Sequence, residues 1–146
     1  IKNKVDAFLF IGTGEFHPIA VALKTGKQVF VFNPVSQTLS KLDSQTVSDF
    51  TQQRKGAMLK FLHAKTVGIL ASTKHGQQRF AEARKLKQKL EKKQGTNQSK
   101  KCYIFVFDTL DFSQLENFPF IDCWINTACP RIADGRSDIL NLNELN

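Results

Sequence analysis

Short apolar runs alternate with amphipathic segments along this chain, and this alternation constrains its fold more than any other feature. The runs are rich in β-branched and aromatic residues, which predicts buried strands at 5–12, 27–34, 66–72, 102–107 and 121–126, the first of them buried on both faces. Apolar residues at helical spacing predict helices at 19–26, at 44–64, and along the face formed by Phe80, Ala83, Leu86 and Leu90. Strand, helix, strand order implies parallel crossovers, so the sequence predicts an α/β fold of parallel-sheet βαβ units with flanking helices.

The predicted elements fall into two α/β units joined by a helix. Residues 1–43 are expected to form the first unit, and the amphipathic segment 44–64 connects it to the second, residues 65–146. The second unit has βαβαβ order, with a polar loop at 93–101 and a helical turn or short helix at 111–117. Few apolar residues follow Ile132, so the tail is expected to end as a short strand or to fray.

The net charge of +8 does not by itself indicate a nucleic-acid partner. The lysines concentrate at 84–93 and 97–101, and a run of charges on a helix usually forms a solvated face. These basic segments lack the interleaved aromatic residues on which bases stack. The sequence therefore predicts no direct binding of nucleic acid.

The apolar runs and the first residue bear on where the protein acts. Because no run is long enough to cross a bilayer and no leader with a cleavage site is visible, we expect a cytoplasmic protein without membrane attachment. The chain begins with Ile1 and its only methionine is Met58, which suggests a piece of a longer protein. Its three cysteines are an odd number, which favours reduced thiols or a metal site over disulfides.

Three polar turns follow predicted strands, and they are the candidate ligand-binding segments. They read "GTGEFHP" at 12–18, "STKHGQ" at 72–77 and "NTACPRI" at 126–132. Ligands of parallel α/β sheets bind beyond the carboxyl ends of the strands, where turns and helix N-termini present backbone N–H groups. The three turns are therefore expected to converge on one side of the sheet.

Each polar residue in the first two turns has both a structural and a functional interpretation. Gly12 and Gly14 form either a tight turn or a ligand contact, because the pattern is short of a dinucleotide fingerprint. His17 either caps and packs its helix or donates to a bound anion. The residues that precede the next helix either form a solvated turn or hold a carboxylate or phosphate: Lys74, Gly76 and Gln77.

The cysteines differ in their surroundings. Cys102 and Cys123 lie in predicted strands, where a cysteine behaves as a small hydrophobe. Cys129 follows the last of these strands, Pro130 keeps the backbone at the cysteine out of a helix, and Arg131 favours a thiolate. The spacing of the three thiols does not predict a self-contained zinc or cluster site. The residues alone indicate a ligand-binding α/β protein with one unusual thiol, and they leave open a nucleophilic pair of Cys129 with His17.

The three turns together resemble a known family. "FIGTGEFHPIAVAL", "STKHGQQRF" and "NTACPRIA", in this order and at these separations, are similar to the archaeal diphthamide-synthesis enzymes, the 2-(3-amino-3-carboxypropyl)histidine synthases. The similarity runs from Val5 to about Ile139, and "NTACPRI" is its most specific part. The resemblance implies three similar α/β domains around a pseudo-threefold axis, each of which contributes one cysteine to a 4Fe-4S cluster.

The resemblance also implies a reaction. In this family S-adenosylmethionine binds at the iron that the cysteines leave free and is cleaved to a 3-amino-3-carboxypropyl radical. The radical adds to a histidine of translation elongation factor 2, the protein substrate, in the first step of diphthamide biosynthesis.

Residue by residue, the resemblance assigns roles to the three turns. Cys129 is similar to the cluster cysteine of the third domain, with Pro130 and Arg131 completing its motif. The turns that face the cofactor cavity in the family are matched in the second domain by Gly12, Gly14, Phe16 and His17, and in the third by Thr73, Lys74, Gly76 and Gln77. On this reading residues 1–43 are the C-terminal part of the second domain, 44–64 the connecting helix, and 65–146 the third domain.

The chain departs from the family in what it lacks. The first domain and the front half of the second, with their cluster cysteines, have no counterpart in the sequence, and Cys102 and Cys123 do not match those ligands. We therefore expect this chain to be the C-terminal portion of the enzyme and to be inactive alone. Missing N-terminal domains, a paralogous subunit or a second copy would complete it. The alternatives are a non-catalytic partner subunit of that complex and a quinolinate-synthase-like cluster protein.

Overall fold

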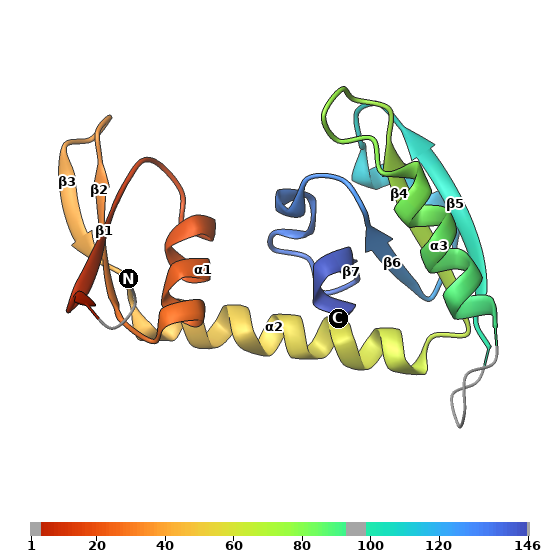
Figure 1. The fold of residues 1–146 in the computed structure, drawn as a ribbon, viewed down its shortest axis with the longest axis horizontal. Coiled ribbons are helices and arrows are strands. Elements are labelled where there is room, and N and C mark those ends of the chain that lie inside the picture. Colours follow the sequence, from red (N-terminus) through yellow and green to blue (C-terminus); the bar gives the residue numbers. More distant parts are fainter. Residues whose placement is uncertain (1–3, 93–98, 146) are drawn as a thin grey trace. The chain divides into compact units, whose positions relative to one another are not determined.

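The computed structural model describes residues 4–92 and 99–145, and the chain divides into two compact units, Ile1–Gln52 and Gln53–Asn146 (Figure 1). The predicted polar loop at 93–101 lies for the most part outside the described residues. Among the described residues, every helix is too short or too polar to span a membrane.

The first unit is a small mixed sheet with one helix beside it. Its elements are β1 (Ala7–Ile11), α1 (Phe16–Thr25), β2 (Gln28–Asn33) and β3 (Thr38–Lys41), and the strand order is β1-β2-β3. The predicted parallel crossover is confirmed, because β1 and β2 pair in parallel through α1. The helix begins three residues before the predicted start at 19, since Pro18 fits the first turn of a helix, where its missing N–H costs no hydrogen bond.

Strand β3 was not predicted from the sequence. It pairs antiparallel with β2, and the side chain of Asn33 accepts a hydrogen bond from the Val35 N–H in the connecting turn (2.9 Å). All four residues of β3 are exposed, and the segment lacks the alternating apolar pattern from which a strand is predicted. Its strand conformation follows from pairing with β2.

The prediction that the first strand is buried on both faces is wrong. One face of the sheet packs on α1, with Ile19 and Val29 at the centre of a small core. On the opposite face Leu9, Ile11 and Leu39 are 60%, 65% and 65% exposed. Side chains alternate between the faces of a strand, and within this unit α1 packs on only one of them.

The second unit is an all-parallel sheet covered on both faces. The helix α2 (Ser44–His63) begins in the first unit and leads into β4 (Thr66–Ser72), α3 (Phe80–Glu91), β5 (Lys101–Phe107) and β6 (Cys123–Asn126). The 3-10 helix η2 (Phe112–Asn117) lies between β5 and β6, and β6 is followed by η3 (Pro130–Ala133), the last strand β7 (Ile139–Asn141) and η4 (Leu142–Leu145). The strand order is β5-β4-β6-β7, and every pair is parallel.

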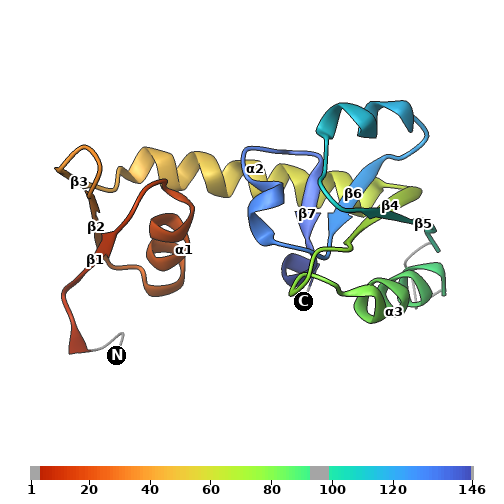
Figure 2. The ribbon, with the colours of Figure 1, turned by 90° about the horizontal axis from the view of Figure 1, so that it is seen from above.

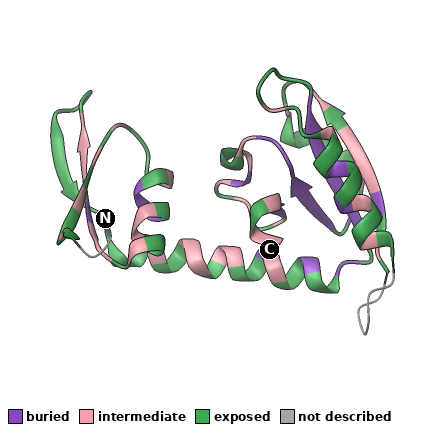
Figure 3. Ribbon diagram, viewed as in Figure 1, coloured by how far each residue is buried: buried purple, intermediate pink, exposed green. Residues whose placement is uncertain are grey.

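Two hydrophobic cores pack on the opposite faces of this second sheet. Figure 2 shows from above that α3 and η2 lie on its two sides. Ala57 and Phe61 of α2 and Ala83 and Leu86 of α3 pack on one face, and Leu115 of η2 packs on the other. The central strand β4 is accordingly buried along almost its whole length (Figure 3). The buried strand predicted at 66–72 is confirmed, and the tail forms the short strand β7.

Candidate functional site

The second and third turns meet at the carboxyl edge of the second sheet. Strands β4 and β6 are parallel neighbours, so the turns after Ser72 and Asn126 leave the sheet on the same side. The Thr127 N–H and hydroxyl both donate to the Leu70 carbonyl oxygen, at 3.0 and 2.8 Å. The Thr73 N–H donates to the Phe107 carbonyl oxygen of β5 at 2.8 Å. These bonds fix the start of each turn to the sheet.

A hollow of about 420 Å³ opens at this edge. It is lined by Lys74, Gln77, Phe107, Asp108, Leu110, Phe112, Cys129, Arg131 and Ile132. Of the residues predicted as a site, Lys74, Gln77, Cys129 and Arg131 therefore lie around one cavity. They combine a thiol, two cationic groups and an amide, which suits a ligand that carries a carboxylate.

Thr73 and Gly76 shape the second turn and do not line the hollow. The Thr73 hydroxyl lies 3.3 Å from both the Phe107 carbonyl oxygen and a carboxylate oxygen of Asp108. Gly76 has φ 77°, a left-handed conformation that a residue with a Cβ rarely adopts, and the Gln77 N–H closes the turn on the Lys74 carbonyl oxygen. Thr73 and Gly76 therefore fix the backbone of the turn that carries Lys74 and Gln77.

Cys129 stands at the start of a short helix, in the backbone conformation expected beside a proline. Its φ and ψ are −62° and 127°, and Pro130 opens η3 directly after it. The Ile132 N–H donates to the Cys129 carbonyl oxygen at 3.0 Å. The thiol is free and half-buried at the rim of the hollow.

Cys102 and Cys123 are packed inside the second unit, as predicted. They are 1% and 0% exposed and belong to the core between the sheet and α3. Burial raises the pKa of each thiol to about 11, and for Cys102 the Glu91 carboxylate adds to the effect. Both thiols are therefore neutral at physiological pH.

Cys129 is expected to be the single thiol that reacts rapidly with an aromatic disulfide reagent at pH 8. With a pKa of about 11, only about one in a thousand of the Cys102 and Cys123 thiols is ionised at this pH, and their side chains are also shielded from the reagent. Mass spectrometry of labelled peptides over time measures the three rates separately. Similar rates at all three cysteines in the folded chain would contradict this expectation.

The first turn belongs to the other sheet. Gly12, Gly14, Phe16 and His17 lie in the first unit, where the Gly12 N–H donates to the Phe32 carbonyl oxygen at 3.0 Å. The prediction that all three turns edge one sheet is wrong, because the strands of the two units form separate sheets. Alternation of strands and helices along a sequence does not reveal which strands pair. The ligand roles of these four residues, and the pairing of His17 with Cys129, stay predictions.

His17 has a packing role that is visible within its own unit. Its ring stacks on Phe10 with centroids 5.9 Å apart and meets the Phe16 ring edge-on at 5.3 Å. Gly14 has φ 82°, which explains a glycine at the tip of this turn.

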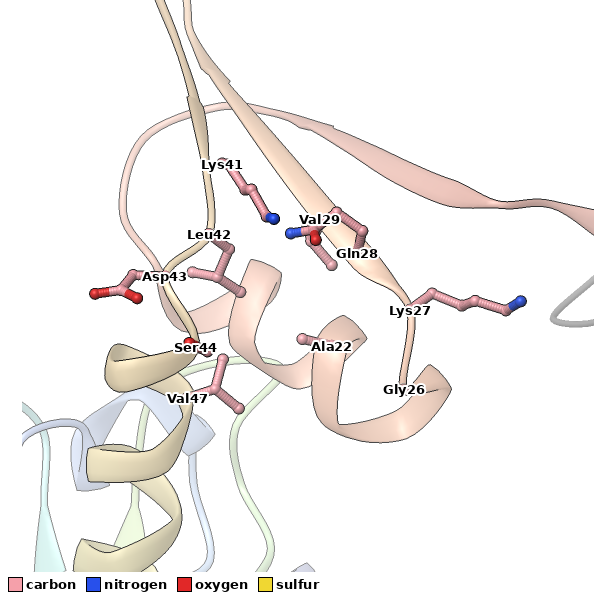
Figure 4. A pocket seen from close by; sticks show the side chains of 10 residues that line it. All are labelled: Ala22, Gly26, Lys27, Gln28, Val29, Lys41, Leu42, Asp43, Ser44 and Val47. Carbon is pink, nitrogen blue, oxygen red and sulfur yellow. The ribbon is translucent and has the colours of Figure 1, made fainter.

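A larger hollow of about 700 Å³ lies at the opposite edge of the first sheet (Figure 4). It is bordered by the end of α1, the start of β2 and the start of α2, with Lys41 and Asp43 among its polar side chains. The carboxylate of Asp43 already accepts the Gln45 N–H at the helix start (3.1 Å). None of the predicted site residues lines this hollow, and it is at the amino end of β2, away from the edge where α/β sheets bind ligands.

The part of the site at the end of β5 and directly after it was not predicted from the sequence. Phe107, Asp108, Leu110 and Phe112 line the hollow, although β5 is remote in sequence from the cysteine turn. Their position at the end of a predicted strand or shortly after it was the available signal. The neighbouring position of β5 and β4, which the sequence did not reveal, brings them to the site.

Within residues 4–92 and 99–145, no group of three or more His, Cys, Asp or Glu side chains is arranged to hold a metal ion. The described part of the chain thus offers one accessible thiol at the hollow and no complete ligand set.

Comparison with known proteins finds the same family that the three motifs indicate. The family model of the diphthamide synthesis proteins matches residues 1–136. The chain belongs to this family. The 2-(3-amino-3-carboxypropyl)histidine synthase of Methanocaldococcus jannaschii is 38% identical over 132 residues, which cover 87% of this chain and 36% of the relative. The synthase of Pyrococcus horikoshii is 34% identical over 131 residues, with 90% and 36% covered.

A solved structure of the family has the same fold. The crystal structure of Dph2 from Pyrococcus horikoshii with a 4Fe-4S cluster matches with a TM-score of 0.77 and 31% identity, over 97% of this chain and 40% of that one. A relative from Schizosaccharomyces pombe, 31% identical over 134 residues, is named subunit 1 of the synthase; the match covers 90% of this chain and 29% of that relative. The chain spans about 36% of the length of the archaeal relatives. The resemblance and the predicted α/β class are confirmed.

Proposed function

We propose that this chain is the C-terminal portion of a 4Fe-4S, S-adenosylmethionine-dependent 3-amino-3-carboxypropyl transferase that acts in the cytoplasm. Its substrate is a histidine of translation elongation factor 2, and the reaction is the first step of diphthamide biosynthesis. One observation carries the proposal: Cys129, Lys74, Gln77 and Arg131 line one hollow at a sheet edge, in a chain of the diphthamide synthesis family. The cluster-bearing Dph2 structure supports it.

The residues around the hollow have the chemistry that the two cofactors need. The Cys129 thiol is accessible and stands in a turn that a proline holds extended, so it suits an iron ligand. Lys74 and Arg131 supply the positive charge, and Gln77 the amide, for the methionine carboxylate of S-adenosylmethionine. When bound, the cluster supplies the electron that cleaves this cofactor. Gly12, Gly14, Phe16 and His17 of the first unit are proposed as further cofactor-binding residues, because their turn resembles that of the family, and Thr73 and Gly76 hold the turn of Lys74.

This chain has one of the three cysteine ligands that such a cluster needs. Cys102 and Cys123 are buried in the core, and no group of three or more ligand side chains forms among the described residues, so one cysteine of this chain is available. The other two cysteines come from further domains of the polypeptide, from a second copy or from a paralogous subunit. Relatives named subunit 1 support a multi-subunit context.

A non-catalytic partner subunit is the second candidate, because relatives of this chain are named as subunits. Such a subunit would have the fold and a docking role without a need for the thiol. The presence of Cys129 at the hollow, beside two cationic residues, favours the catalytic assignment.

Anaerobic reconstitution with iron and sulfide tests the proposal. The chain is treated alone, the unmatched portion of the Methanocaldococcus jannaschii synthase is treated alone as a control, and the two are then combined. After reduction, we expect the electron paramagnetic resonance signal of a 4Fe-4S cluster at full intensity in the mixture only, since three thiolates must converge. Binding of about four irons per molecule by this chain alone would contradict the ligand count. An unchanged signal on addition of the chain would contradict the proposed function.

A further inference from the structure

Two buried asparagines stand side by side behind the cysteine turn. Asn126 ends β6 and Asn141 ends β7, and the two residues are direct partners in the parallel register. They are 1% and 7% exposed. The Asn126 side-chain amide donates to the Asn141 side-chain oxygen at 2.8 Å. A pair of polar side chains at this depth is costly unless its hydrogen bonds are made.

The other side-chain hydrogen bonds of this pair go to the turn that carries Cys129. The Asn126 amide also donates to the Cys129 carbonyl oxygen at 2.8 Å, and its oxygen accepts the Ala128 N–H at 2.9 Å. The Asn141 amide donates to the Pro130 carbonyl oxygen at 3.1 Å. The backbone on both sides of the thiol is therefore bonded to two side chains fixed in the sheet.

A second connection ties Asn141 to helix α2. The Asn141 N–H donates to a carboxylate oxygen of Glu144 at 2.9 Å. Arg54 of α2 binds the same carboxylate through two nitrogens, at 2.5 and 2.9 Å, and its side chain is only 13% exposed. Its guanidinium also donates to the carbonyl oxygens of Arg136 and Ile139, at 3.0 and 2.8 Å. Planar, bidentate contacts of this kind restrict both partners to one geometry.

We infer that Asn126 and Asn141 are positioning residues that hold the turn so that the Cys129 thiol faces the hollow, with Glu144 and Arg54 as their anchor. Its meaning for catalysis rests on the proposed function, in which Cys129 is a ligand. The holding of the turn does not, because it follows from hydrogen bonds within this chain. A purely structural pair would stabilise the second unit as a whole, whereas a positioning pair acts on the turn first.

The test measures the turn without iron. In Asn126→Leu and Asn141→Leu the branched shape of the side chain is kept and the hydrogen bonds are lost, so the alkylation rate of Cys129 by iodoacetamide should change about threefold to tenfold. Cys102 and Cys123 report global opening, because they react only when the core is exposed. The matched control is Asn33→Leu, an asparagine that also ends a strand but in the first unit, which should leave the rate at Cys129 unchanged.

Two results would overturn the inference. One is an unchanged Cys129 rate in both folded variants, and the other is a change that Cys102 and Cys123 share in equal measure. If a variant does not fold, hydrogen exchange on the unaltered chain decides, since the Ala128 and Ile132 amides must be protected if the turn is held. Reconstitution can fail while this test succeeds, and then only the proposed function is lost.

Discussion

Replacement of Gly68 by alanine is expected to lower the free energy of unfolding of the second unit by about 3 kcal/mol or more. Gly68 is in the central strand β4 and pairs directly with Trp124 of β6. A Cβ at this position would lie 2.3 and 2.4 Å from two ring carbons of Trp124. The Phe105 and Phe118 rings pack against the indole with centroids 4.8 and 6.3 Å away, which restricts its movement. Overpacking of a closed core is relieved only by moving strands or rings.

Urea unfolding followed by the fluorescence of Trp124, the single tryptophan, measures this effect in the second unit. The matched control is Gly56→Ala on α2, where an added Cβ meets nothing within 4 Å among the described residues. Alanine at an exposed helical position should stabilise the chain by up to about 1 kcal/mol. A loss below about 1 kcal/mol for Gly68→Ala would show that the sheet yields more easily than the packing implies.

Substitution of Cys129 by alanine is expected to abolish cluster assembly and carboxypropyl transfer in the completed enzyme while the fold stays intact. This expectation rests on the proposed function. The side chain is half-buried in a turn, so its loss should change the free energy of unfolding by less than about 0.5 kcal/mol. A missing ligand leaves an iron without its thiolate, and no other accessible thiol lies in the described part of this chain.

Cys123→Ala is the control for this substitution. The thiol is fully buried in the core, so its removal should cost about 1 kcal/mol of stability and leave the paramagnetic signal in place. Cys129→Ala should thus lose the cluster signal and keep its stability, whereas Cys123→Ala should lose stability and keep the cluster signal. A normal cluster signal and normal transfer in Cys129→Ala would reduce this chain to scaffold or partner.

Local pattern in the sequence was sufficient for most elements of the fold. Apolar spacing predicts the strands around Ile69 and Ile125 and the helix that contains Ala83 and Leu86. The glycine at position 26 predicts the end of α1. The extended backbone at Cys129 followed from Pro130, because a proline restricts the residue before it. These features depend on neighbours in the chain, so they could be predicted without knowledge of the fold.

The resemblance to the diphthamide-synthesis enzymes rested on three turns, and comparison with known proteins confirms the family. The parts of the candidate site that the motifs cover, Lys74, Gln77, Cys129 and Arg131, do lie around one hollow. Their roles in binding stay predictions until the cluster is assembled on the chain.

By itself the sequence determined the order of most strands and helices, the family, and the thiol that stands apart from the other two. Only the tertiary structure decided that the strands form two sheets, that β5 brings Asp108 and Phe112 to the cysteine turn, and that Asn126 pairs with Asn141 behind it. The reason is physical. Periodicity and turn chemistry act between residues close in sequence, whereas strand pairing and buried hydrogen bonds join residues whose separation carries no repeating pattern.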